Sequence, residues 1–260
     1  MTAQSIALSG DSNSNSEAVK KGRSEMMLAW IALVSFYQLY TIIFFVMTKT
    51  QPPPKPWWNE EQIVAWFTQY QTGIKYGFAL CFLSAGLTAC QNALIGYSMR
   101  RMSVSRAFGY SYIAIYSTAT YPGMLLAAVS FAVGAMRLDR DPELMMLIYD
   151  MGLLSFQGTM GIFLIGSLVW MAAVLLDKNN VFPKWFGYFC LCNAFTEFVI
   201  VTIWFTHDGP FAWDGATSFW IALVVFGIYT GVFITLLQNM IKREDFKSGV
   251  LPPLQKKARA

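Results

Sequence analysis

The chain has 260 residues, of which 55% are hydrophobic and only 13% are charged, and its formal net charge is +4. Soluble domains carry about 25% charged residues, so this chain has too little polar surface to cover a water-soluble particle, and its composition predicts a membrane protein. The small net charge, with no basic block and no basic residues interleaved with aromatic ones, gives no sign of nucleic-acid binding.

The first 24 residues are rich in Ser, Asn and Lys and contain no apolar core. They lack the apolar region of a signal peptide, so residues 1–24 are expected to form a disordered tail. Six apolar segments follow between residues 25 and 241, and each is long enough to cross a hydrocarbon core of about 30 Å as a helix. The expected fold is therefore all-α, a bundle of six transmembrane helices. The six segments cover residues 26–48, 74–99, 108–136, 144–176, 185–206 and 216–241.

The first connection reads QPPPKPWW over residues 51–58, which predicts a stiff extended segment with two tryptophans in the headgroup layer. Asn59 and Gln62 have the spacing of a capping box. Five apolar residues that follow share one helical face: Ile63, Val64, Trp66, Phe67 and Tyr70. We expect a separate amphipathic helix that lies flat on the outer face of the membrane. The alternative is that this helix caps the mouth of a cavity.

The later segments carry three further signals. Pro122 is expected to kink the third helix. The fourth apolar segment has about 33 residues and would reach roughly 50 Å as a helix, so it is expected either to project from the membrane or to bend near Gly152 and Gly158. In the sixth segment, Gly227 and Gly231 have a spacing that favours close packing of helices.

The distribution of basic residues predicts the orientation. With the N-terminus inside, the inner segments hold fourteen Lys and Arg residues and the outer loops hold four. This bias places both termini in the cytoplasm, which agrees with an even number of spans. Residues 242–260 would then form a basic cytoplasmic tail.

Catalytic and cofactor-binding patterns are missing from the sequence. The chain contains one histidine, His207, and no P-loop, no nucleotide-binding glycine motif and no nucleophile-elbow motif. One histidine is too few for a His-based metal or haem site. We therefore expect no metal, no cofactor and no catalytic residue of a recognisable kind.

Glu197 lies well inside the fifth apolar segment, and a charge at the centre of a spanning helix costs about 2.5–3.5 kcal/mol. The expected topology puts Lys75, Asp150 and Glu197 in the outer half of the membrane. We expect Glu197 to face the bundle interior beside Asn193, with Lys75 paired to Glu197 or Asp150. Three more polar residues are expected to line the same ligand-binding cavity: Tyr112, Tyr116 and Gln157. The alternative is that Lys75 reaches the membrane surface and that a protonated Glu197 only holds helices together.

Two segments in the last third of the chain, FPKWFGY (182–188) and GPFAWDG (209–215), resemble a group of uncharacterised bacterial multi-pass membrane proteins. This resemblance implies a helical bundle in the bacterial inner membrane. It implies no activity and no catalytic residue.

Three functions follow as hypotheses, all in contact with the lipid bilayer. The first is binding or transport of an apolar or amphipathic small molecule through a cavity near Glu197. The second is a structural or accessory role, with the glycine pair and the basic tail as contacts to a membrane-protein partner or in a homo-oligomer. The third, least favoured by the missing motifs, is an enzyme of unrecognised chemistry.

Overall fold

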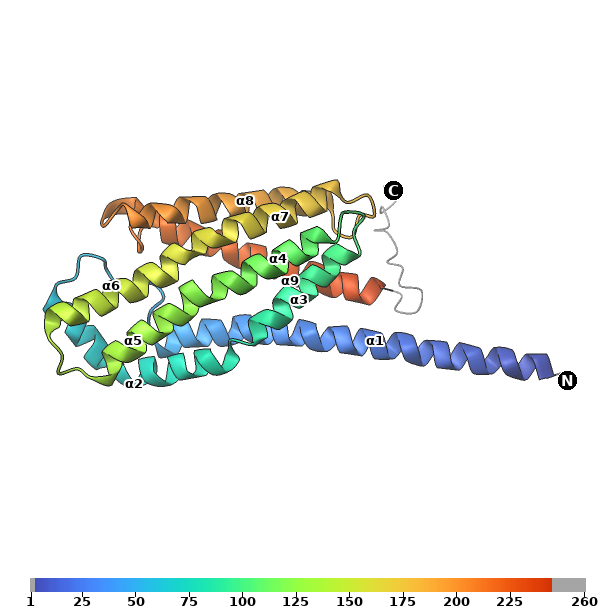
Figure 1. Cartoon of the computed structure of the whole chain (residues 1–260), viewed down its shortest axis with the longest axis horizontal. Helices are drawn as coiled ribbons and strands as arrows, with labels where there is room; N and C mark the ends of the chain where they lie inside the picture. The colour runs from blue at the N-terminus through green and yellow to red at the C-terminus, as the bar shows by residue number, and fades with distance from the viewer. Residues whose placement is uncertain (1–2, 245–260) are drawn as a thin grey trace.

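The structure is a computed structural model that describes residues 3–244, with the surroundings of side chains described for 21–119 and 123–244. Within this part of the chain every regular element is a helix, and six segments are long and apolar enough to cross a membrane (Figure 1). The predicted six-helix membrane fold is confirmed. The six segments are Lys21–Met47, Glu60–Arg100, Ala107–Met136, Pro142–Leu176, Lys184–Trp204 and Gly209–Arg243.

Most of these segments contain a change of helix type. The first three comprise α1 (Ala3–Thr41) with the π-helical η1 (Ile42–Met47), α2 (Glu60–Ser84) with α3 (Leu87–Arg100), and α4 (Ala107–Thr120), the π-helical η2 (Tyr121–Leu125) and α5 (Leu126–Met136). The fourth segment comprises α6 (Pro142–Gly158), the 3₁₀ turn η3 (Thr159–Ile162) and α7 (Phe163–Leu176). The fifth comprises α8 (Lys184–Ile200) and the 3₁₀ turn η4 (Val201–Trp204). The sixth comprises the 3₁₀ turn η5 (Gly209–Phe211), the π-helical η6 (Ala216–Ile221) and α9 (Ala222–Arg243).

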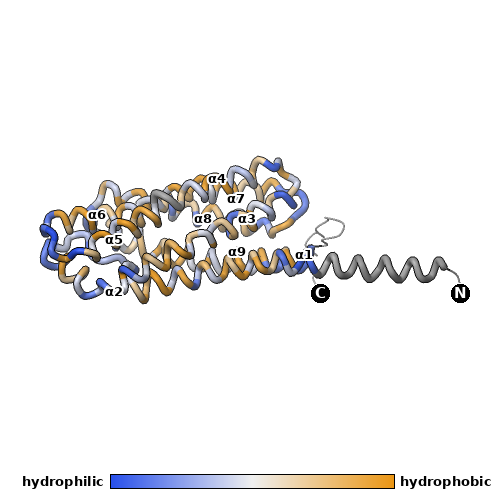
Figure 2. Tube along the Cα trace, turned by 60° about the horizontal axis from the view of Figure 1, so that its bottom comes forward, coloured by the Kyte–Doolittle hydropathy of each residue, from blue (hydrophilic) through white to orange (hydrophobic). Residues whose placement is uncertain are grey.

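The bundle has two ends with different connections. We call the end that carries the α3–α4 and α7–α8 connections the proximal end, and the end that carries the α1–α2, α5–α6 and α8–α9 connections the distal end (Figure 1). Hydrophilic residues gather at both ends and apolar residues fill the stretch between them (Figure 2). This distribution is the one expected for a bundle that crosses a bilayer.

The N-terminal segment differs from the prediction. Helix α1 begins at Ala3, so the structure has helix over most of the segment 1–24, where the sequence predicts a disordered tail, and this helix projects beyond the rest of the bundle (Figure 1). No proline stands before Thr41, and a helix that has been nucleated in the apolar span can propagate along such a segment. The predicted C-terminal tail lies outside the described residues from residue 245 onward.

The separate surface helix predicted after residue 59 is also not formed. The capping box is confirmed, because Asn59 accepts from the backbone of Gln62 and Gln62 accepts from the backbone of Asn59, each at 3.0 Å. However, α2 then continues without a break to Ser84. The apolar face of its first turns, which includes Trp66 and Phe67, packs into the core of the bundle. The amphipathic pattern therefore marks a helix with one face on protein, and not a helix lying on lipid.

Close contact between α2 and η1 depends on Gly73. A Cβ atom at this position would lie 1.9 Å from the backbone oxygen of Met47. We expect Gly73→Ala to lower the free energy of unfolding by about 1–3 kcal/mol, as overpacking of a well-packed interface does. Thermal unfolding in mild detergent measures this, with Gly231→Ala as the matched control, since a Cβ atom there meets nothing within 4 Å. Equal stability of the two variants would contradict the close contact.

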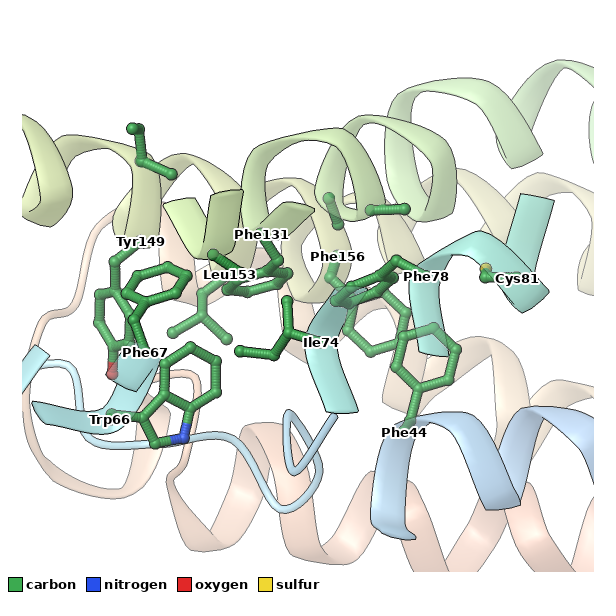
Figure 3. Close-up of a cluster of buried hydrophobic side chains, with 14 of the residues drawn as sticks. Phe44, Trp66, Phe67, Ile74, Phe78, Cys81, Phe131, Tyr149, Leu153 and Phe156 are labelled. Carbon is green, nitrogen blue, oxygen red and sulfur yellow. The ribbon is translucent and has the colours of Figure 1, made fainter. Parts of the chain in front are cut away.

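Two aromatic clusters form the core. The distal cluster joins η1, α2, α5 and α6, and in it Phe78 stacks on Phe131 at 5.5 Å between ring centroids, while Phe44 stacks on Phe156 at 4.6 Å (Figure 3). The proximal cluster surrounds Trp170, which is fully buried. Its ring contacts those of five neighbours: Tyr112, Phe182, Phe186, Tyr229 and Phe233.

The two segments that carry the resemblance tie loops together at opposite ends of the bundle. At the distal end, Asp214 forms an ion pair of 2.8 Å with Lys55, and the indole of Trp213 donates to the carbonyl of Pro54 at 2.8 Å. At the proximal end, the ammonium of Lys184 donates to the carbonyls of Val174, Leu175 and Asp177. These contacts give both segments a structural role.

Candidate functional site

Helix α8 places Asn193 and Glu197 one turn apart on its inner face, where they are 1% and 5% exposed. The amide nitrogen of Asn193 donates to Glu197 Oε1 at 3.2 Å and lies 3.2 Å from the hydroxyl of Ser167 on α7. Glu197 Oε2 and Asn193 Oδ1 are buried without a partner among the described residues. The carboxyl group is therefore only partly satisfied by the described residues.

The first cavity, which we call the central cavity, lies between the two aromatic clusters and holds about 130 Å³. Its walls are largely aromatic and include Tyr112 and Tyr116, whose rings stack at 4.3 Å. Its polar lining consists of Thr88, Gln91, Asn92, Thr159, Asn193 and Glu197, together with the tyrosine hydroxyls. The space thus combines apolar walls with a polar side formed mainly by α3 and α8.

The second cavity, which we call the lateral cavity, holds about 260 Å³ and is bounded by α1, η1, α6, α8, η6 and α9. It adjoins the central cavity, because the two share six lining residues: Tyr37, Tyr40, Phe156, Met160, Glu197 and Phe226. Among the described residues, Glu197 is the only Asp, Glu, Lys, Arg or His that lines either space. The carboxyl group therefore stands at the junction of the two cavities.

Unpaired polar atoms concentrate at these cavities. In the lateral cavity they are Gln51 Oε1, Gln157 Nε2, Glu197 Oε2 and Thr230 Oγ1. In the central cavity Gln91 Oε1 and Asn193 Oδ1 add to them. Buried polar side chains in proteins almost always have a hydrogen-bond partner, either in the protein or in ordered water or ligand. Six such atoms around two adjoining cavities leave hydrogen-bonding capacity that the described residues do not meet.

Interruptions of three spans border the central cavity. The break at Ala85–Gly86 between α2 and α3 precedes the lining residue Thr88, η2 contributes Gly123, and η3 contributes Thr159. A Cβ atom on Gly123 would lie 3.1 Å from Thr159, so η2 and η3 are in close contact. Irregular helical geometry is common at functional sites, and irregular backbone inside a membrane is tolerated where it is buried in protein or lines a cavity.

Two predictions about these helices can be compared with the geometry. The fourth segment leaves α-helical geometry directly after Gly158, while Gly152 lies within regular helix. The carbonyl of Gly158 accepts from the indole of Trp204 at 3.3 Å. Gly227 and Gly231 form no close helix contact with the described part of the chain, because a Cβ atom on either would meet nothing within 4 Å. Their faces are exposed to the surroundings of the bundle.

The structure brings together five of the seven residues predicted for the site. Asn193, Tyr112 and Tyr116 line the central cavity with Glu197, and Gln157 lines the lateral cavity with the same glutamate.

Lys75 and Asp150 line neither cavity. Both are half-buried, and no ion pair joins Lys75 to Glu197 or to Asp150 in the part of the chain that the structure describes. For the pair with Glu197 the physical reason is lateral position, since Lys75 lies on α2, which packs against α5, α6 and η1, whereas Glu197 lies on α8, which packs mainly against α7 and α9. Two residues that are expected at the same depth in the membrane can lie on helices that are not neighbours. Helix α6, which carries Asp150, is a neighbour of α2, so the order of helices is not the reason for the missing pair with Asp150.

Several lining residues were missed from the sequence. Tyr37 and Tyr40 of α1 line both cavities, and Thr230 of α9 and Gln51 of the first connection add unpaired polar atoms. The spacing of Tyr37, Tyr40 and Phe44 along one face of α1 was a usable signal for an inward aromatic stripe. Gln51 gave no such signal, because its position depends on how the connection folds back.

Comparison with known proteins gives no match to a family model, to a curated protein or to a solved structure. The fold itself defines the class, an integral membrane protein with six spans. Among the described residues, no group of three His, Cys, Asp or Glu could hold a metal ion. The cavities around Glu197 are the structural feature that bears on a more specific function.

Proposed function

We propose that this protein binds a small apolar or amphipathic molecule in the central and lateral cavities, and that it transports this molecule across the bacterial inner membrane, with both termini in the cytoplasm. The observation that carries the proposal is the unpaired Glu197 Oε2 at the junction of two spaces with aromatic walls. Apolar walls with a few converging polar groups are typical of small-molecule sites.

The unpaired atoms argue against a purely structural role for this polar group. A buried carboxyl that only holds helices together is most stable when both oxygens are paired, because an unmade hydrogen bond at a buried polar group costs about 1–3 kcal/mol. Here Asn193 pairs one oxygen of Glu197 and leaves the other beside open space. A ligand that donates a hydrogen bond would complete the set.

Transport is favoured over simple storage by the three interrupted spans around the central cavity. Transporters place broken helices at the substrate site near the middle of the membrane, where the two halves of a helix can reorient around it. The interruptions at Ala85–Gly86, η2 and η3 have this location relative to the cavity.

Native mass spectrometry of the protein purified in mild detergent tests the proposal. We expect a discrete mass above that of the chain, and we expect organic extraction to release one small molecule that rebinds saturably to the extracted protein. A protein that carries no molecule from its native membrane, and that binds none saturably from a total extract of that membrane, would contradict binding as the function.

A second candidate is an accessory role in a larger membrane complex, favoured by Gly227 and Gly231. These residues lie four apart on an exposed face of α9 with open space above both, and small residues at this spacing let transmembrane helices approach closely. Light scattering coupled to gel filtration would reveal a stoichiometric partner or a homo-oligomer. Dissociation of that complex by both Gly227→Leu and Gly231→Leu would support this role.

A further inference from the structure

We infer that the ligand is an amphiphile with an uncharged or cationic head group, and that it reaches the lateral cavity sideways from the bilayer through an opening between α1 and α9 beside Gly227. The inference rests on the proposed binding function and adds the class of the ligand and its route. Three features of the lateral cavity support the inference: the residues at the rim, the polar atoms on the inner wall, and the volume of the cavity.

The rim of the lateral cavity includes residues that are also exposed on the outside of the bundle. They are Thr41 of α1 and Phe226 and Gly227 of α9, and the Phe226 side chain is 39% exposed. All three lie inside apolar spans, Lys21–Met47 and Gly209–Arg243, so this rim faces hydrocarbon and not water.

The helices on either side of the opening are held together on its proximal side. The indole of Trp30 on α1 donates to the carbonyl of Ile234 on α9 at 2.9 Å, and the ring of Tyr37 contacts that of Phe233 at 5.9 Å between centroids. At Gly227, farther toward the distal end, a Cβ atom would meet nothing within 4 Å. The absent side chain therefore leaves space at the rim.

The inner wall selects the head group. Glu197 Oε2 and Gln51 Oε1 are unpaired acceptors, and Gln157 Nε2 is an unpaired donor, while Thr230 Oγ1 can donate or accept. Because these two acceptors receive no hydrogen bond from the described residues, the ligand is expected to carry O–H or N–H groups that donate to them.

Charge excludes acidic head groups. Among the described residues, no Lys, Arg or His lines the lateral cavity, so a carboxylate or phosphate would be buried beside Glu197 without a counter-ion. A hydroxyl, an amide or an amine meets no such penalty, and an amine would in addition pair with the carboxylate.

The size of the cavity explains the route. The lateral cavity by itself, at about 260 Å³, is slightly below the roughly 300 Å³ at which pockets for drug-sized ligands begin. A head group and the first part of a chain fit, and the remaining chain stays in the bilayer through the opening. A molecule whose chain remains in the bilayer is expected to enter the lateral cavity directly from the bilayer.

Photolabelling in nanodiscs tests both parts of the inference. The probe is a long-chain primary alcohol with a diazirine in its chain, and its counterpart is the same chain ending in a carboxylate. We expect the alcohol to label residues that line the lateral cavity, and unlabelled alcohol to compete for this labelling, while the carboxylate probe gives no saturable labelling. Gly227→Leu is expected to weaken apparent affinity for the alcohol about tenfold, which corresponds to about 1.4 kcal/mol.

The matched control is Gly231→Leu, one turn farther along the same face. It also replaces an exposed helix glycine with open space above it, and it lines neither cavity. We expect wild-type labelling, and since both variants alter the same small-residue face equally, a change in helix association would affect both.

The outcomes separate the inference from the function on which it rests. Saturable labelling of the cavity that Gly227→Leu leaves unchanged, or that both leucine variants weaken equally, overturns the route. Equal saturable labelling by the carboxylate probe overturns the head-group class. In all these cases binding itself survives. No saturable labelling by the alcohol probe, together with no molecule copurified from the native membrane, overturns both.

Discussion

Asp177→Ala is expected to lower the free energy of unfolding by about 3 kcal/mol or more, because it leaves three backbone N–H donors without their acceptor and an unmade hydrogen bond at a buried polar group costs about 1–3 kcal/mol. Asp177 follows α7 at the proximal end and is 1% exposed. Its Oδ1 accepts from the backbone of Ser103 at 2.7 Å and of Asn179 at 2.9 Å, and its Oδ2 accepts from the backbone of Val181 at 2.8 Å. One carboxylate thus joins the α3–α4 and α7–α8 connections, and alanine would leave three backbone donors without it.

Two further substitutions make this stability measurement specific. Asp177→Asn keeps one acceptor oxygen and should have an intermediate effect, since the second oxygen becomes a donor facing the N–H of Val181. Asp208→Ala, at an exposed position of the distal end, should change stability by less than about 0.5 kcal/mol. Thermal unfolding in mild detergent, monitored by circular dichroism, gives all three values. A loss for Asp177→Ala no larger than that for Asp208→Ala would mean that the carboxylate does not hold the two connections.

Glu197→Gln is expected to weaken ligand binding by roughly tenfold or more while leaving the fold intact. Leaving one partner of a buried hydrogen bond unmatched costs about 1–3 kcal/mol, and each 1.4 kcal/mol is a factor of ten in affinity. Glutamine has nearly the same shape, and its oxygen can still accept from the amide of Asn193, which donates to Glu197 Oε1 at 3.2 Å. The variant should therefore unfold close to the wild-type temperature.

Asp150→Asn is the comparison for this experiment. Asp150 is a second carboxylate within an apolar span, but it lines neither cavity, so its neutralisation should leave affinity unchanged. Isothermal titration with the molecule released from the purified protein measures both variants. Unchanged affinity in Glu197→Gln would reduce Glu197 to a packing role, and an equal loss in Asp150→Asn would restore the larger polar cluster that the sequence suggested.

The sequence predicts features that depend on one helix or one boundary at a time. The six apolar spans, the capping box at Asn59 and the polar pair Asn193 and Glu197 on one face of a helix all follow from local spacing. The expected depth of a residue in the membrane is likewise a prediction from one helix at a time, because it depends on the distance along that helix from the loops.

Features that depend on which helices are neighbours were not available from the sequence. Lys75 shares an expected depth with Glu197, but nothing in the sequence gives the order of helices around the bundle, and the two lie on helices with different packing partners. The sequence likewise did not show that Thr230 lines the lateral cavity, because this also depends on which helices are neighbours. The continuous α2 was missed because the pattern after residue 59 gives an apolar face without saying whether protein or lipid covers it.

The division of the core into two aromatic clusters gives the bundle a mechanical consequence. Each cluster is braced by its own contacts at the bundle end, Lys55 with Asp214 at the distal end and Asp177 with its three backbone donors at the proximal end. Three spans change geometry near the cavity between them. The core is therefore divided into two packed units, with changes of helix geometry in the layer between them. A molecule bound in the central cavity, as proposed above, would contact side chains of both clusters at once, so its binding would depend on how the two clusters are placed relative to each other.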